Sequence, residues 1–254
     1  MESLVFLPPD MPAHIAWMLI AFSFVTSLIT AAIGIGGGYI LLGVMANILA
    51  PAALIPVHGA IQLGSSSGRA FMLFKHVDKS VLGPFLAGGV VGASLGGLLF
   101  VQIPPWSVQL GIGLFIMWTV VGKLPDLTGK RLFGTAIVAS FLSIFLGSTA
   151  NIIAAVVKTL NLSPQAHVGT HAVLMATQHT FKLFIFGFLG FAYGPYIPFL
   201  AAMILVGLAG TFTGKQVLVR AGNYYFRPVL NAILFILAAR LIWIGAEGLI
   251  QSGF

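Results

Sequence analysis

One stretch of the chain carries polar side chains at helical spacing within apolar surroundings. His58, Gln62, Ser65 and Arg69 are separated by four, three and four residues. Residues at this spacing lie on one face of a helix, so the four side chains form a polar stripe. An imidazole, an amide, a hydroxyl and a guanidinium together offer hydrogen-bond donors and positive charge. Such a set suits an oxyanion, although amides and hydroxyls also join neighbouring helices.

A second stripe repeats this pattern with fewer polar members. His171, Gln178 and Lys182 take the first, third and last positions, and an apolar residue takes the second. Ser66 and His179 extend the two stripes by one residue each. Polar side chains within a membrane segment usually face the interior of the bundle or a water-filled path. Alternatively, the charged members could reach the membrane surface and the histidines could only support packing.

Acidic residues are scarce, and their positions exclude several functions. The chain has five of them, all in termini, loops or near a helix end: Glu2, Asp10, Asp78, Asp126 and Glu247. The absence of a carboxylate from the proposed core disfavours a cation transporter, a carboxylate proton relay and an enzyme with an acid and base pair. If protons couple to transport, His58 and His171 are the candidates.

The composition places the chain in a lipid bilayer. Of 254 residues, 59% are hydrophobic and only 7% are charged, with a mean hydropathy of +1.06. A soluble domain has about 25% charged residues, so this chain could not cover a water-exposed surface. The twelve Lys and Arg residues are scattered, which favours cytoplasmic loops over nucleic-acid binding. The absence of cysteine excludes disulfides and thiolate metal sites.

Apolar blocks follow one another along the whole chain. They cover approximately residues 13–33, 38–50, 54–74, 80–101, 106–122, 132–147, 151–161, 165–189, 196–218 and 228–250. A full crossing needs about 20 residues, so the second and seventh blocks are too short to cross. Each of these two blocks follows an irregular stretch, which predicts two broken helices.

The first predicted break is the stretch 31–42, AAIGIGGGYILL. Each glycine in a helix interior costs about 1 kcal/mol relative to alanine, and four of them crowd here: Gly34, Gly36, Gly37 and Gly38. Backbone exposed at membrane depth is tolerated only where protein buries it or where it lines a cavity. Free N–H groups and the positive end of the following helix favour an anion there. The alternative is that the glycines only allow tight packing of a hairpin.

The second predicted break is the stretch 147–151, GSTAN. Ser148, Thr149 and Asn151 make this break polar, whereas the first one is glycine-rich. Polar residues at this position indicate that the tip of the second break meets a hydrogen-bonding group.

Basic segments orient the predicted helices. The segments 75–80, 123–131 and 215–227 hold eight of the twelve Lys and Arg residues, so we place them in the cytoplasm. The stretch 13–50 then becomes a re-entrant hairpin entered from outside, and 132–161 becomes one entered from the cytoplasm. Three crossings follow each hairpin, and both termini lie outside. The predicted fold is an all-α polytopic membrane protein with two inverted-topology repeats.

An internal repeat in the sequence supports this plan. Four residues have a like residue 113 positions further along the chain. The pairs are Gly34 and Gly147, Pro51 and Pro164, His58 and His171, and Arg69 and Lys182. Four matches at one separation, without gaps, are hard to obtain by chance. We divide the chain into a first membrane repeat (1–122), a cytoplasmic linker (123–131) and a second membrane repeat (132–254).

Catalytic and metal-binding motifs are missing or incomplete. Two histidines are spaced by four in HVGTH, residues 167–171, but no suitable third ligand lies nearby. The glycine-rich stretch is not a phosphate loop, because no strand precedes it and no G-K-[ST] follows it. The metalloprotease motif HExxH does not occur. We therefore expect a protein that is not an enzyme and that uses no metal or other cofactor.

The stretch ITAAIGIGGGYIL, residues 29–41, precedes a short limb, a proline turn and a polar helix. This order resembles the TauE/SafE family of sulfite and organosulfonate permeases, also called the toluene-sulfonate uptake permeases. The resemblance extends over the whole chain in its length, repeat and basic loops. One difference is LGSTANII, residues 146–153, where the family often has a second glycine-rich break. The resemblance implies transport of sulfite or a small organosulfonate, such as sulfoacetate or a taurine-derived sulfonate, through the plasma membrane.

These observations predict a secondary transporter of small anions that works by alternating access at a midplane site. The expected substrate-binding residues are Gly34, Gly36, Gly37, Gly38, His58, Gln62, Ser65, Ser66, Arg69, Ser148, Thr149, Asn151, His171, Gln178, His179 and Lys182. The alternatives are an anion channel or a carrier of another small oxyanion or carboxylate. The expected partners are the small anion and the lipid bilayer, without nucleic acid. The glycine-rich stretch 88–97 leaves a homo-oligomer open.

Overall fold

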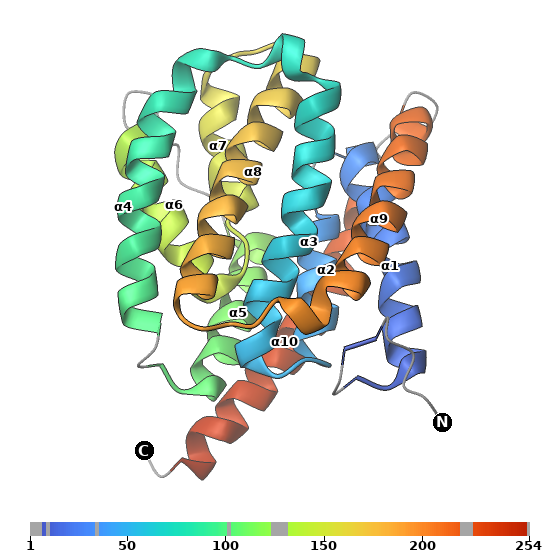
Figure 1. The fold of residues 1–254 in the computed structure, drawn as a ribbon, viewed down its shortest axis with the longest axis vertical. Coiled ribbons are helices and arrows are strands. Elements are labelled where there is room, and N and C mark those ends of the chain that lie inside the picture. The colour runs from blue at the N-terminus through green and yellow to red at the C-terminus, as the bar shows by residue number, and fades with distance from the viewer. Residues whose placement is uncertain are drawn as a thin grey trace.

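The computed structural model describes residues 7–8, 11–33, 36–100, 103–122, 132–218 and 226–252. Within these ranges the chain forms α-helices joined by turns and short 3₁₀ helices, with no β-strand. Figure 1 shows a bundle in which most helices run roughly along the long axis of the molecule. The all-α prediction is therefore confirmed for the described residues.

The predicted apolar blocks all correspond to helices, whose ends differ from the prediction by a few residues. The α-helices are α1 (Ala13–Ile33), α2 (Gly37–Ala46), α3 (Pro51–Met72), α4 (Leu82–Phe100), α5 (Pro105–Val121), α6 (Leu132–Leu146), α7 (Ala150–Thr159), α8 (Pro164–Phe188), α9 (Ile197–Leu218) and α10 (Phe226–Gln251). The 3₁₀ helices are η1 (Phe74–His76), η2 (Lys79–Val81) and η4 (Gly194–Tyr196). The predicted linker 123–131 lies outside the described residues.

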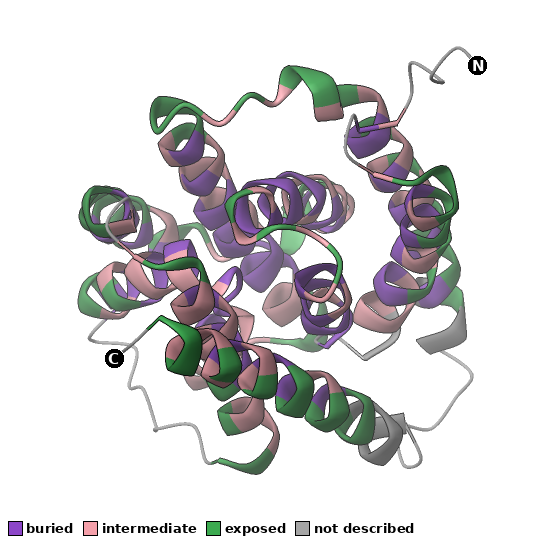
Figure 2. Ribbon diagram, turned by 90° about the horizontal axis from the view of Figure 1, so that it is seen from below, coloured by how far each residue is buried: buried purple, intermediate pink, exposed green. Residues whose placement is uncertain are grey.

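Several helices have the length and composition of membrane spans. Among the described residues, four helical stretches qualify by both criteria: 13–31, 79–100, 194–214 and 231–251. Large apolar side chains lie on the outer faces, as Leu98, Phe188 and Trp243 do with exposed fractions of 72%, 86% and 73%. Figure 2 shows the buried residues, in purple, gathered on the inward faces of the helices. An apolar exterior over span-length helices is the pattern of a multi-pass membrane protein.

The helices pack in pairs that join the two halves of the chain. α1 packs along α9, α4 along α6, α3 along α8, and α5 along α10. Small residues permit two of these close approaches: a Cβ at Gly92 of α4 would lie 2.1 Å from the Ile137 oxygen of α6, and one at Gly210 of α9 would lie 2.2 Å from the Phe24 oxygen of α1. The stretch 88–97 thus packs within its own chain, as small residues do in membrane bundles.

The two predicted breaks both contain a glycine in the left-handed region. Gly36, between α1 and α2, has a φ of 116°, and Gly147, between α6 and α7, has a φ of 73°. A side chain would strain the backbone at either position. Gly37 comes even closer to its neighbour, because a Cβ there would lie 1.7 Å from the backbone oxygen of Thr26. The first break therefore needs its glycines, while Gly34 lies outside the described residues.

The hairpins that contain the breaks are unequal. A bend at mid-depth predicts two short limbs, but α1 has 21 residues and spans about 31 Å. α6 has 15 residues and is shorter. Because Gly37 lies beside Thr26 of α1, α2 starts next to the last turns of α1 and not beyond its end. The first limb of the first hairpin is therefore long enough to cross a bilayer by itself.

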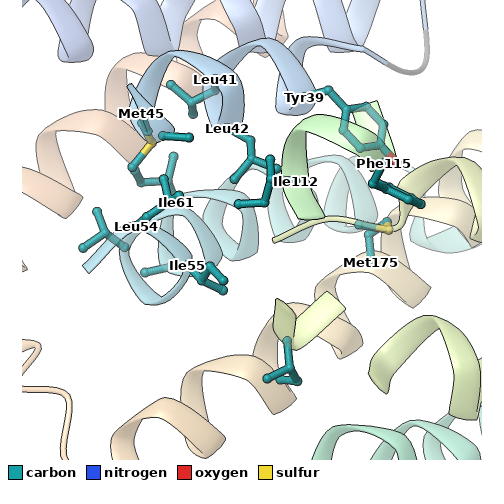
Figure 3. Close-up of a cluster of buried hydrophobic side chains, with 14 of the residues drawn as sticks. Tyr39, Leu41, Leu42, Met45, Leu54, Ile55, Ile61, Ile112, Phe115 and Met175 are labelled. Atoms are coloured by element: carbon teal, nitrogen blue, oxygen red, sulfur yellow. The ribbon is translucent and has the colours of Figure 1, made fainter. Parts of the chain in front are cut away.

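The short helix α2 is fixed by an apolar cluster. Figure 3 shows Leu42 beside Ile112, and the Tyr39 ring above Phe115. The Tyr39 and Phe115 ring centroids are 6.3 Å apart. Leu42, Ile112 and Tyr39 are at most 2% exposed. Burial of this cluster against α5 positions the first break, since burial of each large apolar side chain contributes about 1.5–3 kcal/mol.

Candidate functional site

A small cavity lies between the two breaks and the two polar helices. Its volume is about 20 Å³, which is enough for about one water molecule. The residues that line it are Thr30 of α1, Gly36, Gly38 and Tyr39 at the first break, Gln62, Ser66 and Arg69 of α3, Ser148 and Ala150 at the second break, and His171 and Met175 of α8. Both halves of the chain thus contribute polar residues to one small space.

Arg69 supplies the positive charge of this cavity. The side chain is 7% exposed, and its guanidinium donates to Ser65 Oγ at 2.8 Å and to Ser66 Oγ at 3.2 Å. Both partners are neutral hydroxyls on the preceding turn of α3. In the described part of the chain, no carboxylate forms an ion pair with Arg69. A buried charge that lacks an opposite charge is costly, and an anion beside Arg69 would lower this cost.

A second, larger pocket adjoins Arg69 on the other side. It has a volume of about 180 Å³ and is lined by Ala31, Arg69, Met72, Leu73, Pro164, Gln165, Val168 and Thr211. The end of α3 and the start of α8 form most of this lining. These two helix ends lie at the top of Figure 1, beside η1 and η2. Arg69 therefore stands between the central cavity and a pocket at the end of the bundle that carries Lys75 and Lys79.

Two histidines connect the polar helices to the starts of the short helices. His58 Nε2 lies 3.1 Å from the Gly38 oxygen, and His171 Nε2 lies 3.1 Å from the Ala150 oxygen. A carbonyl oxygen can only accept, so each ring carries a hydrogen on Nε2 and donates it. The contacts are alike in the two halves of the chain, since each histidine fixes the first turn after its own break.

The second break is held by its own polar side chains. Thr149 Oγ1 donates to the Ala139 oxygen at 3.0 Å and accepts from Gln178 Nε2 at 3.0 Å. Lys182 Nζ donates to the Gly147 oxygen. These bonds tie the break to α6 and α8. Thr149, Gln178 and Lys182 therefore position the tip and do not line the cavity.

The short helices begin without side-chain caps. Gly36 before α2 has no side chain to form a cap, and the Thr149 side chain before α7 forms no capping hydrogen bond. The first N–H groups of a helix have no partner within the helix. Tyr39 Oη accepts one of them, the N–H of Asn151, at 3.0 Å. This bond joins the two breaks directly, so the tips meet at the cavity.

A comparison with protein families assigns the chain. Residues 19–241 match the sulfite exporter TauE/SafE family. The protein belongs to this family. Neither curated proteins nor solved structures gave a match. The match covers both breaks and both polar helices, and it confirms the resemblance noted in the sequence. Membership makes the protein a membrane transporter of the sulfite-exporter type.

In this TauE/SafE protein, the predicted site residues fall into two groups. Seven line the cavity: Gly36, Gly38, Gln62, Ser66, Arg69, Ser148 and His171. Eight lie outside its lining: Gly37, His58, Ser65, Thr149, Asn151, Gln178, His179 and Lys182. The stripes therefore divide along their length, and only the part of α3 toward Arg69 and the part of α8 around His171 reach the cavity.

Sequence reasoning missed four lining residues: Thr30, Tyr39, Ala150 and Met175. Tyr39 carries the clearest signal, because its hydroxyl follows directly on the glycine run in an apolar limb. Met175 is the apolar residue at the second position of the second stripe, and Gln62 holds the same position in the first stripe. Thr30 and Ala150 have no distinguishing pattern, and only the fold brings them to the cavity.

Proposed function

We propose that the protein is a secondary carrier of small oxyanions, with sulfite or a small organosulfonate as its substrate. The observation that carries the proposal is the buried Arg69, which lines the small cavity between the two breaks and has no carboxylate partner among the described residues. The substrate supplies the missing negative charge. Arg69, Ser66 and Gln62 hold its oxygens from α3.

The helix starts strengthen the preference for an anion. α2 and α7 begin at the cavity, and neither has a side-chain cap. The N-terminus of a helix carries about half a positive charge and free N–H groups. Two such ends that face one cavity favour a ligand with several acceptor oxygens. A sulfite or sulfonate group has three oxygens and a delocalised negative charge, and it meets this requirement.

The size of the cavity supports a carrier over a channel. A volume of about 20 Å³ holds one water molecule and not an oxyanion with its oxygens. Binding then requires the breaks to separate slightly, and passage requires them to separate further. An open channel would need a continuous polar path, whereas Arg69 stands between the cavity and the neighbouring pocket.

Two inverted repeats, residues 1–122 and 132–254, provide the means of alternating access. With five helices in each repeat, α1 corresponds to α6 and α4 corresponds to α9. The packing of α1 on α9 therefore has its counterpart in the packing of α6 on α4. The contacts of His58 and His171 with their own short helices agree with this. The repeats rock against each other around the cavity. The linker 123–131 joins them.

The basic segments set the orientation in the plasma membrane. η1 and η2 carry Lys75 and Lys79 at the end of the bundle where α3 finishes. We place this end in the cytoplasm. The start of α1 and the end of α10 lie toward the opposite end in Figure 1, and with the basic end in the cytoplasm we propose that both termini lie outside. The pocket beside Arg69 then opens toward the cytoplasm.

Anion binding to the purified protein tests the proposal. Titration calorimetry with sulfite, sulfate, thiosulfate, taurine, sulfoacetate and acetate identifies the substrate class. Arg69→Gln removes one charged hydrogen-bond donor, which contributes about 1.5–3 kcal/mol, so the affinity should fall by about ten- to one-hundredfold. Lys75→Gln is the matched control, because Lys75 is exposed at the same end of the bundle.

Two results would contradict the proposal. Unchanged affinity in both Arg69→Gln and Gln62→Ala removes the cavity from the binding site. Counterflow in liposomes separates the two transport mechanisms, since only a carrier accelerates the entry of labelled anion when unlabelled anion is present inside. Flux without such acceleration and without saturation identifies a channel.

A further inference from the structure

A second basic cluster lies toward the opposite end of the α3–α8 pair. His58, His179 and Lys182 form it, and each is at most 1% exposed. The His58 and His179 rings meet edge to face with centroids 6.4 Å apart. The Lys182 ammonium interacts electrostatically with both rings. None of the three side chains lines the cavity at Arg69. We call this group the lysine cluster.

Each residue of the lysine cluster corresponds to a polar residue of the cavity through the 113-residue separation found in the sequence. The pairs at 113 residues are Arg69 and Lys182, Ser66 and His179, and His58 and His171. α3 and α8 pack together with opposite directions (Figure 1), so this separation places corresponding residues toward opposite ends of the pair. The bundle thus carries two similar sets of donors. Arg69 adjoins a pocket at its end, whereas Lys182 is completely buried.

The hydrogen bonds of the lysine cluster are incomplete. His58 Nδ1 and both ring nitrogens of His179 are buried without a partner. Lys182 donates to the Gly147 oxygen, and no carboxylate of the described residues acts on its charge. Buried polar groups without partners and buried charges without counter-charges are unfavourable. A ligand that accepts hydrogen bonds and carries negative charge would satisfy the His179 N–H and the Lys182 ammonium, whereas His58 Nδ1 is an acceptor because the hydrogen of that ring lies on Nε2.

We propose that Lys182 and His179, with the His58 ring beside them, form a second binding site for the transported oxyanion, which is closed in this conformation and accessible from the opposite end. This inference rests on the proposed function, because it names where the same substrate binds in the alternate state. Arg69 receives the anion from the pocket at the basic end. Lys182 receives it from the other side of the membrane.

The second break couples the two sites. An anion at the lysine cluster takes the place of the Gly147 oxygen as the partner of Lys182. Gly147 directly precedes Ser148, which lines the cavity at Arg69. Movement of this break to open one site therefore changes the lining of the other. The two sites are used in turn and not together.

Transport measured separately from each side tests this inference. Right-side-out and inside-out vesicles containing the full chain take up ³⁵S-sulfite, and initial rates give a KM for each side. Lys182→Gln should raise the KM about tenfold or more from the outer side only, because a charged donor is lost there. Arg69→Gln is the matched variant and should raise the KM from the cytoplasmic side only.

Charge restoration separates binding from packing. The chain has no cysteine, so Lys182→Cys carries a single thiol. Modification with 2-aminoethyl methanethiosulfonate adds an ammonium and should restore uptake from the outer side. The neutral methyl reagent is the control and should not restore it. Equal restoration by both reagents means that Lys182 only fills space, which overturns the inference.

The remaining outcomes distinguish the two proposals. If Lys182→Gln changes the KM equally on both sides, or changes it on neither side, the second site is overturned. The proposed cavity site at Arg69 is not affected by this result. Arg69→Gln and Gln62→Ala that are both without effect on either side overturn the proposed function itself. If Lys182→Gln elutes as aggregate, Lys182→Arg replaces it, because this variant keeps the charge. The KM of Lys182→Arg measured from the outer side should stay within about threefold of the wild type. If this KM changes more while the KM from the cytoplasmic side is unaltered, Lys182 does not act through its charge.

Discussion

The first break offers the sharpest test of the structure, through the change Gly37→Ala. The added Cβ would lie 1.7 Å from the Thr26 oxygen and 2.4 Å from Thr30 Oγ1. Real Cβ atoms essentially never come within 3.0 Å of such an atom, so the start of α2 must move by more than an ångström. The obstacle is backbone and cannot rotate away.

The expected cost follows from this overlap. Overpacking in a well-packed interior costs about 1–3 kcal/mol, and Gly37→Ala should fall at the upper end because the backbone of α1 must yield. A loss of about 3 kcal/mol lowers the melting temperature by roughly 6–12 °C for a chain of this length. Gly36 and Gly38 line the cavity on either side. The affinity for the transported anion should therefore fall together with the stability.

The measurement is thermal unfolding in detergent, combined with titration of sulfite. Gly134→Ala is the matched control, because a Cβ at Gly134 of α6 meets nothing within 4 Å. This control should be neutral or slightly stabilising, since alanine favours a helix by about 1 kcal/mol over glycine. If Gly37→Ala matches Gly134→Ala in melting temperature and affinity, α2 does not approach α1 as described.

Three further changes test other parts of the site. Tyr39→Phe removes the acceptor of the Asn151 N–H and should cost about 1–2 kcal/mol, with weaker anion binding measured by calorimetry; unchanged binding argues against contact between the tips. Gly147→Ala forces a side chain into a φ of 73° and should lose about 1–2 kcal/mol, read from the melting temperature, whereas equal stability excludes the left-handed turn. Gly92→Ala places a Cβ 2.1 Å from the Ile137 oxygen. It should lower stability by about 1–3 kcal/mol at constant anion affinity, and a parallel loss of affinity contradicts its purely structural role.

The sequence was informative about the helices because hydropathy and glycine act locally. The apolar blocks corresponded to the helices, since a segment in lipid must satisfy its backbone hydrogen bonds within itself. The breaks at Gly36 and Gly147 were also located, because glycine is costly in a helix and needed at positive φ. The sequence did not predict that α2 starts beside the last turns of a full-length α1, because hydropathy does not say where a returning helix starts.

The sequence was less informative about the site. Helical spacing placed the polar residues of α3 and α8 on one face each, but spacing carries no information on which turn of that face meets a cavity. His58 and Lys182 consequently appeared equivalent to His171 and Arg69. The structure separates them, because Lys182 is bonded to the Gly147 oxygen while Arg69 stands between two pockets.

The sequence alone determined that the protein lies in a lipid bilayer and that two of its helices are interrupted. It also determined that positive charge lies in the interior without a carboxylate. Each of these follows from composition or from short-range spacing. Tertiary structure decided that the two breaks touch through Tyr39 and Asn151, and that Arg69 faces the space between them. These contacts join residues more than a hundred positions apart, and their geometry depends on how whole helices pack against each other.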